Sequence, residues 1–293
     1  MKPLFFAFPG NEDLLLKLVA QQPAERGIAD FRQFPDGETY VRIDSELKNR
    51  QVVIVCTLHQ PDTKFLLLHF FSKIAREMGC AKITLISPYL GYMRQDKIFK
   101  VGEGLTSTYF AHLVSSCVDE LITIDPHLHR IASLNKIYTI PCRAMQAAVH
   151  IARWITQHVP NPLLIGPDSE SEQWVSDVAI KAKAPFVVLQ KIRTGDKEVR
   201  VSVPNVQAYA GVTPVLVDDI ISTGKSMMET ILHLKKINLS APVCVGIHAV
   251  FAPGAYQELL ATGASRVVTC NTIPHESNQI DISDLLQVNG KQI

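Results

Sequence analysis

One segment of the sequence combines acidic residues, small polar residues and a glycine in an order that suits a sugar phosphate. An apolar run at 215–217 is followed by the paired carboxylates Asp218 and Asp219, and a helix-period segment begins a few residues later. Carboxylates bind sugar hydroxyls or hydrated Mg²⁺, and small residues that open a helix leave backbone N–H groups available for a phosphate. This loop consists of Ser222, Thr223, Gly224, Lys225 and Ser226. The segment is therefore a candidate site for both ends of a sugar phosphate.

Two other interpretations of this segment are weaker. The run 224–226 looks like the end of a nucleotide-binding P-loop, but that motif requires a glycine five positions before Gly224, where this chain has Asp219. A solvated turn between a strand and a capped helix would contain similar residue types. A buried strand that ends in paired aspartates favours a binding loop over such a turn.

A second segment, 87–97, follows the apolar run 83–87 and combines tyrosines with Arg94 and Gln95. A guanidinium binds phosphate oxygens as a fork or stacks on a base, and an amide can hydrogen-bond to a nucleotide. The alternative is a surface ion pair between Arg94 and a nearby aspartate.

Three further segments carry weaker signals. The segment 125–129 contains His127 and His129 at a strand end, and a His-x-His pair could bind metal in a hydrolase barrel. That barrel needs eight strand–helix units and usually has the motif on an early strand, whereas here it lies near mid-chain. The turn 34–38 is a weak signal by itself, and the basic turn 191–197 is by itself typical of a solvated hairpin.

These segments need a scaffold of alternating strands and helices. Short β-branched runs predict strands at 52–56, 83–87, 121–124, 163–165, 186–189, 215–217, 243–250 and 267–270, with an earlier strand at the N-terminus. Helix-period segments lie near 64–78, 106–117, 145–158, 170–183, 225–238 and 254–262. The alternation predicts an α/β fold with mainly parallel sheets flanked by helices, in two similar domains, 1–144 and 145–293. Ligands of such sheets bind beyond the carboxyl ends of the strands.

Composition excludes several classes of function. The 293 residues include 29 Lys and Arg against 28 Asp and Glu, and a formal charge of +1 gives no electrostatic support for binding nucleic acid or a membrane surface. A hydrophobic fraction of 47% with 19% charged residues predicts a folded core. The six cysteines form no C-x-x-C pair, and no apolar stretch is long enough to span a membrane. We therefore expect a soluble cytoplasmic protein with reduced thiols.

The segment 218–226 resembles the phosphoribosyl-diphosphate loop shared by phosphoribosyltransferases and ribose-phosphate pyrophosphokinases. The segment 87–97 is similar to the ATP-binding segment of the pyrophosphokinases and has no counterpart in ordinary phosphoribosyltransferases. The resemblance to the pyrophosphokinases covers nearly the whole chain, and further matches occur in the expected order at 34–38, 125–127, 191–193 and 271–274.

The resemblance implies two similar phosphoribosyltransferase-like domains and a diphosphoryl transfer from MgATP to the anomeric hydroxyl of ribose 5-phosphate, which gives phosphoribosyl diphosphate and AMP. It assigns the ribose hydroxyls to Asp218 and Asp219 and the 5-phosphate to the loop 222–226. ATP would bind Arg94 and Gln95. A loop from a neighbouring subunit would complete the ATP site with Phe34, Asp36, Gly37 and Glu38. A homo-oligomer, a dimer or a hexamer, is therefore expected.

The resemblance also implies a metal site and a catalytic loop. His127 and Asp168 would position the Mg²⁺ that carries ATP. Lys191 and Arg193 would belong to a loop that closes over the transferring phosphates, where positive charge and the exclusion of water accelerate the reaction. The expected catalytic residues are thus Lys191, Arg193 and His127.

Several positions depart from the family pattern. Ser222 stands where a third acid is usual, Lys225 stands where a small residue is usual, and the acidic run 169–172 replaces a Gly-rich turn. Phe99 replaces a polar residue, and the segment 134–141 is longer than usual. Two other functions stay open, a non-catalytic regulatory relative and a phosphoribosyltransferase that consumes phosphoribosyl diphosphate. The loop lysine and the metal histidine argue against the first, and the ATP-binding segment argues against the second.

Overall fold

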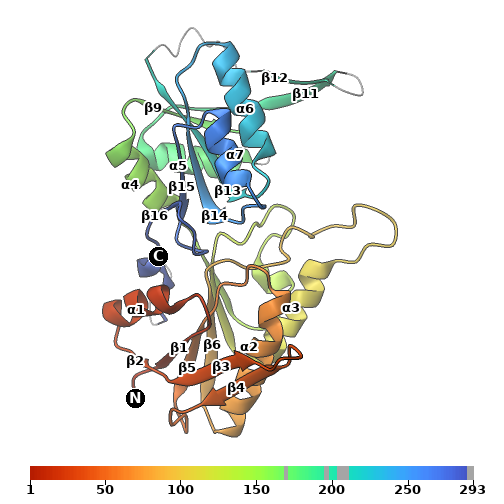
Figure 1. Cartoon of the computed structure of the whole chain (residues 1–293), viewed down its shortest axis with the longest axis vertical. Helices are drawn as coiled ribbons and strands as arrows, with labels where there is room; N and C mark the ends of the chain where they lie inside the picture. Colours follow the sequence, from red (N-terminus) through yellow and green to blue (C-terminus); the bar gives the residue numbers. More distant parts are fainter. Residues whose placement is uncertain (168–170, 195–197, 203–210, 289–293) are drawn as a thin grey trace. The chain divides into compact units, whose positions relative to one another are not determined.

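The computed structural model describes residues 1–167, 171–194, 198–202 and 211–288, and the chain forms two compact units (Figure 1). The first unit comprises Met1–Met145 and the C-terminal stretch from Ser283, and the second comprises Gln146–Ile282. Each unit contains a parallel sheet with helices packed around it, which confirms the predicted α/β class.

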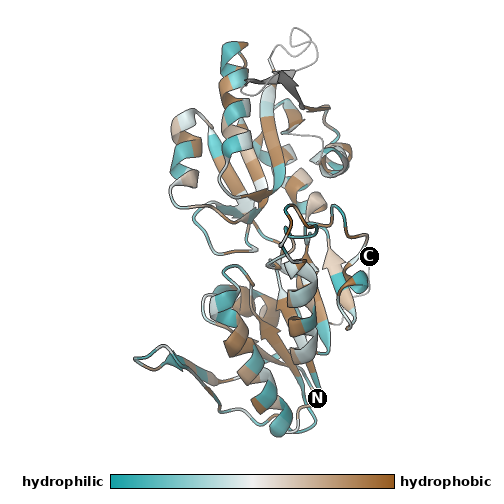
Figure 2. Cartoon of the chain, turned by 90° about the vertical axis from the view of Figure 1, so that its right-hand side faces the viewer, coloured by the Kyte–Doolittle hydropathy of each residue, from teal (hydrophilic) through white to brown (hydrophobic). Residues whose placement is uncertain are grey.

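Six parallel strands form the main sheet of the first unit, in the order β2 (Glu25–Arg26), β1 (Leu4–Ala7), β5 (Gln51–Val55), β6 (Lys82–Ser87), β7 (Glu120–Ile124) and β8 (Cys142–Met145). In the central strands β5, β6 and β7, every residue after the first is buried. Strands buried on both faces need continuous runs of aliphatic residues, and the brown strands of Figure 2 show that this is what the sequence provides.

Helices α1 (Glu12–Gln21), α2 (Asp62–Glu77) and α3 (Thr106–Cys117) complete the core of the first unit. The ring of Phe71 on α2 lies 5.0 Å from that of Phe6 and 5.4 Å from that of Phe8. An antiparallel hairpin, β3 (Ala29–Gln33) and β4 (Thr39–Ile43), packs on α2 through Phe31, whose ring lies 6.0 Å from Phe71. A short 3-10 helix (Leu134–Lys136) precedes β8.

The second unit repeats the plan. Its sheet has the order β10 (Phe186–Val188), β9 (Pro162–Gly166), β13 (Thr213–Ile221), β14 (Val243–Ala249), β15 (Arg266–Cys270) and β16 (Asn278–Ile280). Its helices are α4 (Ala148–His158), α5 (Glu172–Ala182), α6 (Lys225–Lys236) and α7 (Ala255–Thr262). A separate antiparallel pair is formed by β11 (Gln190–Thr194) and β12 (Glu198–Ser202).

The C-terminal stretch returns to the first unit. Gln21 donates to the Ser283 hydroxyl at 2.9 Å, and Arg143 donates to the carbonyls of Gln287 and Val288 at 3.1 and 3.0 Å. A short 3-10 helix (Ser283–Leu286) lies against α1. The last described residues are therefore anchored by specific polar contacts that the sequence did not indicate.

Within the described residues, no helix is both long and apolar enough to cross a membrane. All eight named strand runs and all six helical segments predicted from the sequence correspond to elements of the structure. The sequence did not predict α1 or the β3–β4 hairpin. The hairpin strands are mostly half-buried or exposed and contain several polar residues, so they lack the apolar run that marks the central strands.

Candidate active site

Two carboxylates lie near the end of β13. The strand continues to Ile221, so Asp218 and Asp219 belong to the strand rather than to the loop that follows it. Asp218 lies in register with Gly246 of β14, and its Oδ1 accepts a hydrogen bond from the Asp219 N–H at 3.0 Å. Both aspartates are half-buried. The sheet thus fixes their backbone while the carboxylates remain accessible to a polar ligand.

The loop after β13 leads directly into α6. Gly224 is the N-cap residue of this helix and has a φ of +67°, and its carbonyl accepts from the Met228 N–H at 2.8 Å. A Cβ at this position would lie 3.1 Å from the side chain of Leu259, so a side chain here would be strained by the backbone and would crowd Leu259. Because glycine has no side chain to cap the helix, the first-turn N–H groups remain suited to a phosphate. Thr223 and Lys225 are exposed beside them.

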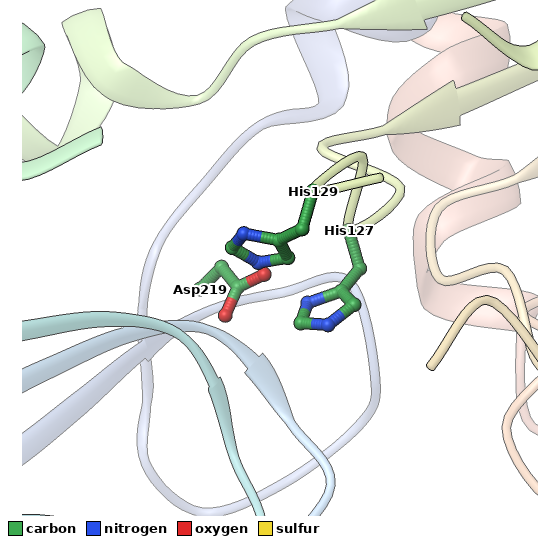
Figure 3. Close-up of side chains that lie close together, drawn as sticks. All are labelled: His127, His129 and Asp219. Carbon is green, nitrogen blue, oxygen red and sulfur yellow. The ribbon is translucent and has the colours of Figure 1, made fainter. Parts of the chain in front are cut away.

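The histidine loop, residues 125–130, follows β7 in the first unit. Asp125 and His127 have positive φ values of 35° and 54°, which are uncommon for residues other than glycine. The His127 N–H donates to the Asp125 carbonyl at 2.8 Å, and the Asp125 N–H donates to the Met145 carbonyl at 2.9 Å. The ring centroids of His127 and His129 lie 4.1 Å apart in an edge-to-face arrangement. Figure 3 shows both imidazoles projecting from this loop, with Asp219 of the second unit also labelled.

The segment after β6 offers fewer aromatic faces than its composition indicates. Tyr89 and Met93 are buried in the core, and the Tyr92 ring packs 4.7 Å from that of Phe110. The Tyr92 hydroxyl donates to Asp62, and this hydrogen bond raises the pKa of the tyrosine. The tyrosines therefore shape the segment rather than present stacking surfaces to a ligand.

Arg94 is exposed at this edge, and Gln95 is half-buried with its Oε1 accepting from the Thr106 hydroxyl at 2.6 Å. The aspartate nearest in sequence, Asp96, pairs instead with Arg130 of the histidine loop, at 3.2 Å. Arg94 forms no ion pair with another described residue, so the structure does not support the alternative of a surface ion pair between Arg94 and a nearby aspartate.

The turn between β3 and β4 is short and well defined. The Phe34 N–H donates to the Glu38 carbonyl at 2.8 Å, and the Gly37 N–H donates to the Phe34 carbonyl at 2.9 Å. The Asp36 carboxylate accepts from the Glu38 N–H at 3.2 Å, and Gly37 has a φ of +89°. Phe34 is 45% exposed. The turn thus presents an aromatic ring and two acids on an ordered hairpin.

Two expected catalytic residues lie on β11. Lys191 is in register with Val201 of β12, and Arg193 is in register with Val199. They therefore belong to a strand of an antiparallel pair, two residues apart, rather than to the turn that the sequence predicted. The expected metal ligand Asp168 lies outside the described residues.

Sequence reasoning missed a polar cluster after β5. The Lys64 ammonium donates to the Thr57 carbonyl at 2.8 Å and lies 3.1 Å from His59 Nδ1. Burial, together with the charge of Lys64, lowers the pKa of His59 to about 4. Burial also lowers the pKa of Lys64. These residues belong to no motif, and they meet where the chain passes from the end of β5 into α2, so no sequence pattern marked them.

In the first unit, the fold brings several of these features together. Strands β6 and β7 are neighbours in a parallel sheet, so Arg94, Gln95 and the histidine loop all follow its carboxyl edge. The Ile124 N–H donates to the Pro88 carbonyl at 3.3 Å, which joins the two strand ends. In the second unit, Asp218, Asp219 and the loop after them lie at the end of one central strand. Ligands of α/β sheets bind beyond the carboxyl ends of the strands, and these features lie near such ends.

Comparison with known proteins identifies the same two parts. Residues 4–117 match the N-terminal domain of ribose phosphate pyrophosphokinase, and residues 136–284 match the phosphoribosyl transferase domain. A crystal structure of phosphoribosylpyrophosphate synthetase from Mycobacterium smegmatis has a similar fold, with a TM-score of 0.83 and 22% identity over 96% of this chain and 93% of that chain.

Curated relatives are similar along most of their length. A ribose-phosphate pyrophosphokinase of Sulfurisphaera tokodaii is 30% identical over 90% of this chain and 91% of its own. The protein of that name from Methanopyrus kandleri is 30% identical over 91% of each chain, and that from Methanobrevibacter smithii is 27% identical over 93% of this chain and 95% of its own. The chain therefore belongs to the ribose-phosphate pyrophosphokinase family.

Proposed function

We propose that the protein is a ribose-phosphate diphosphokinase that transfers the diphosphoryl group of MgATP to the anomeric hydroxyl of ribose 5-phosphate. The products are phosphoribosyl diphosphate and AMP. Family membership supports the reaction, and one observation in the chain carries the assignment of the acceptor site: paired aspartates on β13 followed by the open N-terminus of α6 at Gly224. Such a site suits a ligand with vicinal hydroxyls and a terminal phosphate.

In this proposal the acceptor binds to the second unit. Asp218 and Asp219 accept hydrogen bonds from the ribose hydroxyls. The 5-phosphate is held by the backbone N–H groups and hydroxyls of the loop 222–226, with the Lys225 ammonium near it. This loop has three hydroxyls, a glycine and a lysine, and Ser222 and Lys225 stand where the family pattern has an acid and a small residue. Positive charge at a helix N-terminus strengthens the binding of a phosphate dianion.

ATP is proposed to bind at the carboxyl edge of the first unit. Arg94 is exposed there, and its guanidinium suits bidentate contact with phosphate oxygens. Gln95 is held by Thr106, so its amide has a fixed orientation toward a nucleotide. Phe34, Asp36, Gly37 and Glu38 are proposed to complete the site of a neighbouring subunit.

Magnesium is the metal that we propose for His127 and Asp168. Mg²⁺ keeps several waters in nucleotide sites and takes only one or two protein ligands, so the half-buried His127 imidazole with Asp168 is a sufficient protein contribution. When bound, Mg²⁺ would neutralise charge on the ATP phosphates. Lys191 and Arg193 are proposed to stabilise the charge of the transferring group. Phosphoryl transfer needs mainly positioning and charge neutralisation, and these residue types supply both.

We also propose that the protein is a cytoplasmic homo-oligomer whose two domains bind different substrates. Helix α2 exposes Leu66 and Phe70, whereas Leu68 and Phe71 of the same helix are buried. An apolar face of this kind supports a homo-oligomer, either a dimer or a hexamer. The six cysteines, all among the described residues, form no disulfide, which supports the proposal of a cytoplasmic protein. We propose that residues 1–144 bind ATP and that residues 145–293 bind ribose 5-phosphate and carry the catalytic residues Lys191 and Arg193.

Measuring AMP formation from MgATP tests the proposed function. Purified protein should release AMP only when ribose 5-phosphate is present, and Lys191→Ala should reduce this release. AMP release without ribose 5-phosphate would indicate a hydrolase. No release across a range of Mg²⁺ and phosphate concentrations would favour the non-catalytic relative.

A further inference from the structure

The histidine loop contains a second imidazole that the proposed function does not use. His127 and His129 have ring centroids 4.1 Å apart with an interplanar angle of 67° (Figure 3). His127 is half-buried and His129 is exposed, and their ring nitrogens include a pair of potential ligand atoms within 4.8 Å of each other. Two imidazoles this close are a common arrangement for binding a metal ion.

The backbone of the loop explains why the rings meet. The His127 N–H donates to the Asp125 carbonyl and the His129 N–H donates to the His127 carbonyl, at 2.8 and 3.1 Å. These consecutive i to i+2 hydrogen bonds have the pattern of γ-turns and shorten the chain between the two histidines. Positive φ values at Asp125 and His127 accompany the turns. Such unfavourable backbone conformations persist where the surroundings hold them, and they cluster at binding sites.

Both ends of the loop are held in place. At its start, the Asp125 N–H donates to the Met145 carbonyl at 2.9 Å. At its end, the Arg130 guanidinium contacts both carboxylate oxygens of Asp96, at 3.2 and 3.3 Å. The two rings are therefore presented by an anchored loop, and a metal ion would not have to order it. Preorganisation of this kind raises affinity because less conformational entropy is lost on binding.

We propose that His127 and His129 together chelate a first-row transition-metal dication. Zn–N bonds are about 2.0–2.1 Å, so two ligands of one ion lie at most about 4.2 Å apart. The two nitrogens lie within 4.8 Å of each other, so a shift of at most about 0.6 Å meets that limit. Imidazole favours Zn²⁺, Ni²⁺, Cu²⁺ and Co²⁺, whereas Mg²⁺ prefers oxygen ligands. The second histidine therefore adds transition-metal binding to a loop whose first histidine is proposed to hold Mg²⁺.

This inference deepens the proposed function, because it rests on His127 being the metal residue of the ATP site. What it adds is a role for His129 and the binding of a transition-metal ion by the two imidazoles together. Binding of the metal alone can be measured without ATP or ribose 5-phosphate. A failure of the metal site and a failure of the diphosphokinase reaction are therefore observed in separate experiments.

The test uses the full chain, freed of metal by chelator and dialysis, and CoCl₂ as the probe. Calorimetry gives the affinity for Co²⁺, and visible absorption reports nitrogen ligation of the ion. The variants are His127→Asn, His129→Asn, the double variant and His129→Gln. His112→Asn is the matched control because His112 is an exposed histidine on α3 of the same unit. Far-UV circular dichroism checks that each variant is folded.

The expected result is that His129→Asn and His129→Gln each weaken Co²⁺ binding roughly tenfold or more, comparable to the loss of a metal-site contact. The double variant should be little weaker than either single variant, because one ion shares both rings. His112→Asn should bind Co²⁺ as the unmodified chain does. Equal affinity of His129→Asn and the unmodified chain, or additive losses in the double variant, would overturn the proposal.

Discussion

The carboxylate of Asp96 is 1% exposed and is held by the guanidinium of Arg130, which reaches it from the loop after the neighbouring strand. Arg130 Nη1 lies 3.2 and 3.3 Å from the two carboxylate oxygens. This pair ties the end of the histidine loop to the segment that carries Arg94 and Gln95. The proposed metal residue and the proposed ATP residues are thus positioned by one ion pair.

Replacing Arg130 by alanine should destabilise the first unit. The buried Asp96 carboxylate would lose its partner, and an unsatisfied buried polar group costs about 1–3 kcal/mol. The free energy of unfolding, measured by urea denaturation, should fall by that amount, and the KM for ATP should rise. Arg42→Ala is the matched control, since the Arg42–Asp44 pair has side chains 59% and 39% exposed. Its loss should change the free energy of unfolding by less than about 1 kcal/mol. Equal effects of the two variants would contradict the positioning role.

The affinity for ribose 5-phosphate should depend on Gly224. Gly224→Ala places a methyl group against Leu259 at a residue with a φ of +67°, so it strains the backbone of the loop and crowds Leu259. The KM for ribose 5-phosphate should rise at least about tenfold, equivalent to about 1.4 kcal/mol, while the KM for ATP changes little.

A matched control for that variant is Gly254→Ala. Gly254 is also a left-handed N-cap of a helix in the second unit, with a φ of +81°, but a Cβ there meets only the flexible Glu258 side chain at 3.6 Å. The control should lose some stability and keep its KM for ribose 5-phosphate. A similar rise in this KM for both variants would show that general loosening of the unit, rather than the loop, is responsible.

Much of this organisation was predictable because it is encoded locally. Continuous apolar runs predicted the central strands, and charged or polar residues that follow these runs marked the carboxyl edges where Asp218, Arg94 and His127 lie. The Asp96–Arg130 pair was not predictable, since its partners are 34 residues apart and meet only because β6 and β7 are neighbours. The burial of Tyr89 was missed for the same reason: tertiary packing decides it, not residue type.

Stability should decline as the pH falls because of His59. The pKa of its imidazole is lowered to about 4 in the folded chain by burial and by the charge of Lys64, whereas an unfolded histidine titrates near 6.5. Between these pH values the unfolded chain binds more protons, so the contribution of neutral His59 is present above pH 6.5 and is lost as the pH falls toward 4. Urea denaturation at pH 7 and pH 4.5 should show a smaller pH effect for His59→Gln than for the unmodified chain. An identical pH effect would refute the assignment.

Substitutions of Lys191 and Arg193 on β11 should reduce turnover more than substrate binding. Lys191→Ala and Arg193→Ala should each lower kcat roughly 10²–10³-fold, as expected for the loss of one group that stabilises transition-state charge. Arg200→Ala is a suitable control, because Arg200 lies on β12 in register with Ile192, the residue between Lys191 and Arg193. A comparable loss of kcat in the control would contradict specific roles for Lys191 and Arg193 and would indicate that the β11–β12 pair acts through its overall charge.

In the proposed reaction, the second and third phosphates of ATP are transferred together to the sugar. Phosphorus-31 NMR of a reaction with MgATP and ribose 5-phosphate tests this directly by identifying both products. The expected products are AMP and a sugar that carries a diphosphate on its anomeric carbon, formed in equal amounts. Formation of ADP with a sugar bisphosphate would contradict it, because only the terminal phosphoryl group would then have been transferred.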